Sequence, residues 1–321
     1  MFVIPPFVQP CLGWRSPVVM VIQATLNLDP SARQIDVDGI FGQKTLARLH
    51  EIGCTGTEVT RECNEKLAKW RNKILSDNHD LMSNVSLPVK YVIASIVSAV
   101  EVGYRKHAFD HIEGDIGDGA GTNYGAFCFN SRGSMAEFMT RFPGMNREEA
   151  LRTPLSGPVQ VDMIWNKVTV DDVLGTVIYD SPVYTSKTMV LALLTTFDVI
   201  VQNGSWSHVA RPPKCIDEEW WDEHVWWYDW GRVKKHGKNM SALFLDIADN
   251  AWDLNIDPQQ VLVAFATLRA WASRPKYARA VWRRKLAMAN GFGRIHGIDI
   301  DVVNHWGLAS WLGSAKKVGK Q

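Results

Sequence analysis

The chain has 321 residues, of which 46% are hydrophobic and 21% are charged, and its formal net charge is +1. Such values are typical of a globular protein, and the length allows either one large domain or a small module joined to a larger one. The nearly neutral charge excludes a global basic field, so we expect no nucleic-acid partner. Fourteen tryptophans suit both a dense core and a groove that binds sugars.

None of the five cysteines belongs to a CxxC pair, and their number is odd; they are Cys11, Cys54, Cys63, Cys128 and Cys215. This pattern favours reduced thiols in a protein made in a cytosol. One bridge between Cys11 and Cys54 or Cys63 is an alternative. The first ten residues lack the features of a signal peptide. The apolar stretch 89–102 is too short and too polar to span a bilayer, so we expect no membrane insertion.

The first 80 residues predict three helices. Ser16 and Pro17 are typical of a helix start, and apolar residues follow at helical spacing. A second helix should follow the turn 37–42 and end at Gly53, and a third should run from about 58 to 75. The polar stretch 76–86 predicts a linker, which gives two domains, 1–80 and 85–321.

The second domain should be mainly α-helical. A strongly apolar helix over 89–103 has Glu101 near its end. The stretch 107–134, rich in glycine and aspartate, predicts loops and a small β-hairpin. Later helices are expected at 145–152, 186–201, 216–230, 241–252, 258–272 and 277–290.

The segment Val37-Asp38-Gly-Ile-Phe-Gly-Gln-Lys-Thr45, with Gln23 and Leu26 ahead of it, resembles the three-helix peptidoglycan-binding domain of bacterial and phage wall hydrolases. In the turn itself, Asp38 can bind backbone N–H groups, glycines 39 and 42 allow special dihedral angles, and Phe41 fills the core. These are scaffold roles. Binding to bacterial peptidoglycan is therefore implied by the resemblance alone.

A second segment, which begins at Glu101-Val-Gly-Tyr104, resembles the lysozyme superfamily. Phage muramidases of that superfamily carry a comparable motif followed by "TNYG", matched here by Gly121-Thr-Asn-Tyr-Gly125. Its chitosanase-like enzymes carry "IGDGRGYT", matched here by Ile116-Gly-Asp-Gly-Ala-Gly-Thr122. Val102 replaces a glycine of the first motif and Ala120 an arginine of the second, so both branches stay open. Both hydrolyse glycosidic bonds in polymers of amino sugars.

Cleavage of a glycosidic bond needs a proton donor and stabilisation of an oxocarbenium-like transition state. A carboxyl group at the end of an apolar helix loses hydration, which favours its neutral form, so Glu101 is the expected general acid. Asp118 in the glycine-rich loop should stay ionised and either activate water or stabilise charge on the sugar. Thr122 or Asn123 is expected to hold the water. Glu113 and Asp115 are alternatives to Asp118, since Asp-Gly is also common in plain turns.

Aromatic residues complete the expected site. Tyr104, Tyr124 and Trp227 are candidates for sugar binding, although most of the tryptophans between 220 and 230 should pack between helices. His107 and His111 are four residues apart and could bind zinc on a helix. The sequence has no HExxH motif, so we expect solvated histidines and neither a metal nor another cofactor.

The combination resembles a phage endolysin. The resemblance implies a monomeric N-acetylmuramidase that accumulates in the host cytoplasm and reaches the wall, for example in a Gram-negative periplasm, once the inner membrane is permeabilised. A lytic transglycosylase, a chitosanase-like glycosidase, and a non-catalytic wall-binding or virion protein are the alternative interpretations.

Overall fold

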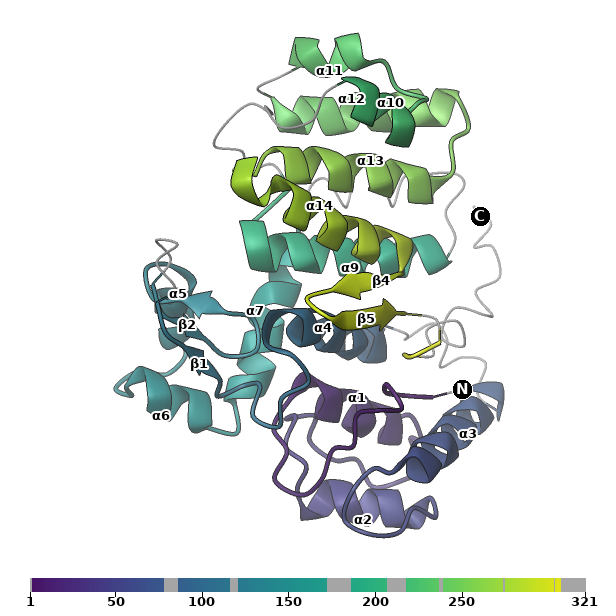
Figure 1. Cartoon of the computed structure of the whole chain (residues 1–321). Helices are drawn as coiled ribbons and strands as arrows, with labels where there is room; N and C mark the ends of the chain where they lie inside the picture. Colours follow the sequence, from purple (N-terminus) through teal and green to yellow (C-terminus); the bar gives the residue numbers. More distant parts are fainter. Residues whose placement is uncertain are drawn as a thin grey trace. The chain divides into compact units, whose positions relative to one another are not determined.

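A computed structural model describes residues 2–77, 86–115, 121–171, 186–206, 218–236, 239–273, 275–302 and 304–306. It is 57% helical, and its described part contains 13 helices and two small antiparallel sheets (Figure 1). The expected mainly α class is therefore confirmed. Contacts divide the chain into two compact units: unit 1 comprises 1–163 and 301–321, and unit 2 comprises 164–300.

Unit 1 contains the N-terminal helices and a three-stranded sheet, and its last helix crosses into unit 2. The helices are α1 (Pro17–Leu26), α2 (Gln43–Glu51), α3 (Arg61–Asp77), α4 (Ser86–Val102), α5 (Ser134–Met139), α6 (Arg147–Arg152) and α7 (Ser156–Thr169). The strands are β1 (Ile112–Glu113), β2 (Asn123–Tyr124) and β3 (Phe129–Asn130). The sheet has the order β1-β2-β3 and is antiparallel, so the expected hairpin is present with one additional strand.

Helix α1 forms the centre of the N-terminal part. It begins with Pro17 at its first position, as predicted, and all ten of its residues are buried. It packs against α2, α3 and, most extensively, α4. The predicted peptidoglycan-binding helices and the apolar helix α4 are thus parts of one compact unit. The predicted division of the chain into 1–80 and 85–321 stays a prediction, because residues 78–85 lie outside the described part.

The turn at Asp38 has the scaffold role expected from its sequence. The buried Gln23 side chain accepts from Gly39 N (2.8 Å) and donates to Asp38 Oδ1 (2.8 Å) and to Ile40 O (3.1 Å). Gly39 has φ of +75° and Phe41 is fully buried, both as expected. The expectation for Gly42 is wrong, because it precedes α2 in ordinary extended geometry with φ of −99°.

Phe109 connects this turn to the later part of unit 1. A Cβ atom added at Gly39 would lie 2.5 Å from the Phe109 ring, and one added at Gly157 would lie 2.8 Å from it. The absence of side chains at both glycines therefore lets the turn, the buried ring and helix α7 pack together.

The cysteine prediction needs a correction. Cys54 and Cys63 form a disulfide, whereas Cys11 and Cys128 are free. Cys54 lies in the loop after α2, and Cys63 lies in the first turn of α3. The loop between the two helices brings their sulfur atoms together. Their spacing of nine residues is not a recognisable motif, which is why the sequence favoured reduced thiols. Cys215 lies outside the described residues.

Unit 2 is a stack of helices followed by a β-hairpin (Figure 1). Its elements are α9 (Ser186–Asn203), α10 (Glu218–His224), α11 (Trp230–His236), α12 (Met240–Asp253), α13 (Pro258–Trp271), α14 (Pro275–Asn290), β4 (Phe292–Ile295) and β5 (Ile298–Asp301). Helix α14 packs against α13 on one side and α9 on the other, and α12 packs against α13.

The single helix expected over 216–230 is wrong, because the chain turns between α10 and α11. The indole N–H of Trp221 donates to Tyr228 O (2.9 Å), which holds the chain in a turn instead of a continuous helix. Trp230 then reaches Trp271, with ring centroids 4.6 Å apart, and Trp221 lies over the same ring at 5.9 Å. Tertiary stacking of tryptophans thus overrides the local helical pattern.

An ionic group is buried in unit 2. Asp198 on α9 is fully buried and contacts Arg284 and Lys285 on α14, with Arg284 Nε 2.7 Å from Asp198 Oδ1. Burial opposes ionisation of Asp198, but the two cations outweigh it and lower the pKa of this carboxyl group. The ion group therefore pins α9 to α14 through an ionised aspartate.

No helix in the described ranges is long and apolar enough to cross a membrane. This agrees with the expectation for the apolar stretch 89–102.

Candidate active site

Glu101 lies in the last turn of α4, and its side chain is half-buried. The helix ends there because Gly103 adopts φ of +75° while its N–H still donates to Ala99 O (2.8 Å); glycine tolerates this left-handed conformation without strain. The apolar face of α4 packs on α1. The sequence thus places a carboxyl group at the end of a buried helix, as predicted.

A chain of hydrogen bonds joins the end of α4 to the end of β2. Arg105 Nε donates to Val102 O (2.5 Å), and Arg105 Nη1 lies 3.4 Å from His111 Nδ1. The His111 carbonyl in turn accepts from Gly125 N (2.7 Å). Burial, followed by the charge of Arg105, lowers the pKa of His111, so the ring stays neutral at neutral pH and Nδ1 can accept from Arg105. The Glu101 and "TNYG" motifs therefore meet through Arg105 and His111.

Strand β2 carries the other expected polar residues. Asn123 lies opposite Glu113 of β1 and Asn130 of β3. Thr122 is held by Ser131, which donates from its N–H to Thr122 O (2.8 Å) and accepts from Thr122 N at its hydroxyl (3.1 Å). Side chains directly opposite each other on a sheet share one face, so Asn123 and Glu113 are brought together.

Gln160 is a positioning residue that sequence reasoning missed. This fully buried side chain of α7 accepts from Ala126 N (2.8 Å) and donates to Phe109 O (2.8 Å). A Cβ atom added at Gly125 would lie 2.3 Å from Gln160 Oε1. The glycine of the "TNYG" motif thus makes room for the amide that holds the turn after β2. A glutamine on a helix far along the chain gave no signal of this contact.

The predicted carboxylate partner of Glu101 lies outside the described residues, since Asp118 falls within 116–120. Of the two alternatives, Asp115 pairs with Arg132, with Asp115 Oδ2 and Arg132 Nη2 3.5 Å apart. Glu113 is exposed and lies opposite Asn123. Among the described carboxylates of this loop, Glu113 is the one that the sheet register places opposite Asn123, an expected water-holding residue.

The two histidines considered as metal ligands have separate contacts. His107 Nδ1 lies 3.8 Å from Asp110 Oδ2, which also pairs with Arg15 Nη1 at 3.6 Å. His111 faces Arg105 instead. Within the described ranges, no group of three His, Cys, Asp or Glu side chains is arranged so that it could hold a metal ion.

Tyr104 belongs to an aromatic cluster that we define as Phe7, Tyr104, His305 and Trp306. Phe7 meets Tyr104 edge to face at 5.3 Å and His305 at 5.7 Å, and Tyr104 stacks on Trp306 at 6.3 Å. Burial raises the pKa of Tyr104, so its hydroxyl stays protonated. The Phe7 ring remains 56% exposed. Residues from both ends of the chain form the cluster, so local sequence patterns could not reveal it.

Trp227, the third sugar-binding candidate, is a largely buried residue. It lies in unit 2, is only 6% exposed and contacts Tyr228 edge to face at 6.2 Å. The neighbouring Trp226 is 69% exposed. Packing thus covers most of the Trp227 side chain, and the same was expected for most of the tryptophans between 220 and 230.

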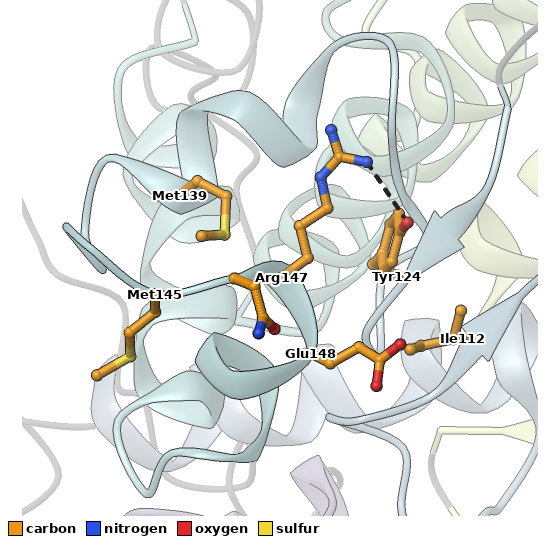
Figure 2. Close-up of a pocket in the computed structure, with 7 residues that line it drawn as sticks. Ile112, Tyr124, Met139, Met145, Arg147 and Glu148 are labelled. Atoms are coloured by element: carbon orange, nitrogen blue, oxygen red, sulfur yellow. Dashed lines mark hydrogen bonds between the residues drawn. The ribbon is translucent and has the colours of Figure 1, made fainter.

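Tyr124 lines an open hollow of about 770 Å³ on unit 1. Figure 2 shows its phenol ring facing the guanidinium group of Arg147, with Met139 and Met145 on the other side. Arg147 Nη1 is 3.5 Å from the Tyr124 hydroxyl, and the guanidinium carbon lies 5.6 Å from the ring centroid. Tyr124 is therefore oriented by Arg147 at the rim of a surface depression.

No known protein family, curated protein or solved structure matches this chain. A half-buried carboxyl group at a helix end, tied to a strand with polar and aromatic side chains, has the components of a general acid and a sugar-binding surface.

Proposed function

We propose that the protein is a glycoside hydrolase of the lysozyme type that cleaves the glycan backbone of bacterial peptidoglycan, with Glu101 as the general acid. The observation that carries the proposal is the hydrogen-bonded connection from the end of α4, through Arg105 and His111, to the turn that follows Thr122, Asn123 and Tyr124. This connection keeps the acid and the polar strand in one compact unit.

In the proposed reaction, Glu101 protonates the leaving oxygen of the glycosidic bond while positive charge develops on the sugar ring. A second carboxylate stabilises that charge or removes a proton from the attacking water. Asp118 remains the candidate of first choice for this role, and Glu113 is the alternative among the described carboxylates. Thr122 and Asn123 orient the water, and the Ser131 contacts to Thr122 support that role by fixing its backbone.

The aromatic cluster around Tyr104 suits the same substrate class. The exposed Phe7 ring rests on Tyr104, which is three residues from Glu101 in the chain. Flat apolar rings with a polar edge pack against the C–H faces of sugars. The aromatic cluster is therefore proposed as the surface that supports a sugar near the acid. The proposed partner is peptidoglycan, and the proposed active form is the monomer.

The endolysin role is part of the proposal. The Gln23–Asp38 turn resembles that of wall-binding modules, and no described helix is suited to cross a membrane. We propose that the protein acts on the wall after release from a host cytoplasm, with α1–α3 contributing to wall binding. A transglycosylase, a chitosanase-like enzyme and a non-catalytic wall-binding protein remain the alternatives that the experiment must separate.

The test compares wild type with Glu101→Gln and with the control Glu137→Gln, which removes an exposed carboxylate on α5. General-acid catalysis contributes about 10²–10⁴-fold, so Glu101→Gln should lose lysis of permeabilised cells by that factor while the control stays active. Circular dichroism verifies folding. A folded and fully active Glu101→Gln protein would contradict the assignment.

The products and substrates separate the alternatives. Mass spectrometry of digested wall should show new reducing ends after hydrolysis, whereas a transglycosylase leaves anhydro-sugars. Chitosan offered beside peptidoglycan should be cleaved more slowly if the wall is the substrate. An inactive wild-type protein that still sediments with isolated wall would instead support the non-catalytic interpretation.

A further inference from the structure

The hollow beside Tyr124 combines features that fit an acidic peptide better than a neutral sugar. Its lining residues come from β1, β2, the end of α5, the segment before α6, and α6 itself: Ile112, Tyr124, Met139, Met145, Asn146, Arg147 and Glu148. Ile112 and Met145 are exposed although both are large and apolar. The floor and sides are thus partly apolar, and Arg147 contributes a positive charge.

Arg147 is the feature that selects a negative ligand. In the described part of the chain its guanidinium group contacts the Tyr124 hydroxyl and ring, and no carboxylate pairs with it. The two nearest acids on the same helix are otherwise engaged: Glu148 pairs with Arg152 at 3.3 Å, and Glu149 accepts from Asn146 N at 3.0 Å in a capping box. A guanidinium group held at the hydroxyl end of a tyrosine by one N–H keeps further N–H groups for bidentate binding of a carboxylate.

The two methionines suit a flexible apolar chain. Figure 2 shows the Met139 and Met145 side chains on the opposite side of the hollow from Tyr124. Methionine side chains adapt to irregular apolar ligands because they are unbranched and polarisable. A hollow with an arginine on one side and methionines on the other therefore fits a short peptide whose carboxylates and aliphatic groups alternate.

The location ties the hollow to the proposed catalytic strand. Tyr124 and Asn123 are consecutive residues of β2, so their side chains point to opposite faces of the strand. A peptide branch of four residues reaches about 13 Å when extended, which is enough to pass from one face of a short strand to the other. A glycan contacted by Asn123 can thus place its peptide branch at Tyr124.

We infer that the hollow beside Tyr124 binds the carboxylate-bearing peptide branch of the glycan, with Arg147 as the carboxylate-binding residue. The inference rests on the proposed function and deepens it, since it makes peptide-substituted glycan the preferred substrate. A chitosanase-like enzyme acting on an unbranched polymer has no use for such a site.

The kinetic test uses full-length protein and two substrates prepared from the same wall: intact peptidoglycan and glycan strands from which an amidase has removed the peptides. The variants are Arg147→Gln and the control Arg141→Gln, an exposed arginine in unit 1 outside the hollow. Wild type and control should cleave the peptide-bearing substrate with about tenfold higher kcat/KM, as one charge-assisted contact allows. Arg147→Gln should lose this preference and cleave the two substrates with equal kcat/KM.

A binding test works without catalysis. A soluble four-residue branch peptide is titrated into protein labelled with ¹³C at its methionine methyl groups, and Met139→Leu and Met145→Leu identify the two resonances. Both resonances should shift on titration in wild type and not in Arg147→Gln. Absent shifts in wild type, or equal cleavage of both substrates by an active wild type, would overturn the inference. Shifts without any cleavage would support the peptide site and contradict the proposed hydrolase.

Discussion

Two buried amides of unit 1 and a buried ion group of unit 2 hold their surroundings together in different ways. In unit 1, Gln23 holds the Asp38–Gly39 turn and Gln160 holds the turn after β2, both through hydrogen bonds to backbone groups. Unit 2 uses charge, with Asp198 between Arg284 and Lys285. Amides satisfy turns without a titrating group, whereas a buried ion group joins two helices at a large desolvation cost. The two glutamine-held turns of unit 1 therefore rest on amides that do not titrate, whereas the contact between α9 and α14 in unit 2 depends on an ionised carboxylate.

The largest expected effect comes from neutralising the ion group. Asp198→Asn removes the ionised carboxylate that the buried Arg284 and Lys285 contact, which should lower the free energy of unfolding by about 3–5 kcal/mol. Urea denaturation followed by tryptophan fluorescence measures it. Asp249→Asn, an exposed change on α12, is the control and should stay within about 0.5 kcal/mol of wild type. A loss below about 1 kcal/mol in Asp198→Asn would contradict the ionic account of unit 2.

Removing either glutamine tests the amide scaffold. Gln160→Leu leaves the Ala126 N–H and the Phe109 carbonyl without partners, and Gln23→Leu does the same to Gly39 N–H. Each unsatisfied buried group costs about 1–3 kcal/mol, so Gln160→Leu should be destabilised by about 2 kcal/mol or more and Gln23→Leu by about 1–3 kcal/mol. If the turn after β2 positions the site and the Asp38–Gly39 turn does not, Gln160→Leu should also lose lytic activity at temperatures at which the variant is still folded.

The matched variant makes that result specific. Gln23→Leu should keep most of its kcat under the same folded conditions, because its turn has a scaffold role. Equal losses of kcat in the two variants would show that the turns do not differ in function, and the distinction between them would be abandoned.

The smallest expected effect is the pH dependence of the stability that Asp198 contributes, which appears only in acid. The folded pKa of Asp198 is lowered, so its contribution to stability is complete above the unfolded value of about 3.9 and is lost as the pH falls through the lower folded pKa. Between pH 7 and 5 this contribution should not change. Below pH 4, hydrogen exchange should show α9 and α14 losing protection before the Gln23 turn does. The reverse order would contradict the contrast between the units.

Local patterns predicted what depends on neighbouring residues. The starts and ends of most helices, the scaffold role of Asp38, Gly39 and Phe41, and the position of Glu101 at a helix end could all be deduced from the sequence. Capping residues, glycines and apolar spacing act within one or two turns, so they leave a readable signal.

Contacts between distant residues left no such signal. Gln160 supports Gly125 from another helix, and Phe7 and Trp306 meet Tyr104 from the two ends of the chain. The break between α10 and α11 follows from the stacking of Trp230 on Trp271. The Cys54–Cys63 bridge likewise depends on how α3 approaches the loop after α2. Each of these features is decided by tertiary packing, which a periodic pattern does not encode.

Phe109 has a practical consequence for anyone who would shorten this protein. Its ring fills the space left by Gly39 and Gly157, and α4 buries its apolar face on α1. Deleting residues 1–80 to obtain a shorter fragment would expose both surfaces to water, and such apolar patches promote aggregation. Fusion partners and affinity tags should therefore be added to the intact chain and should not replace residues 1–80. The first three helices should be kept in every derivative.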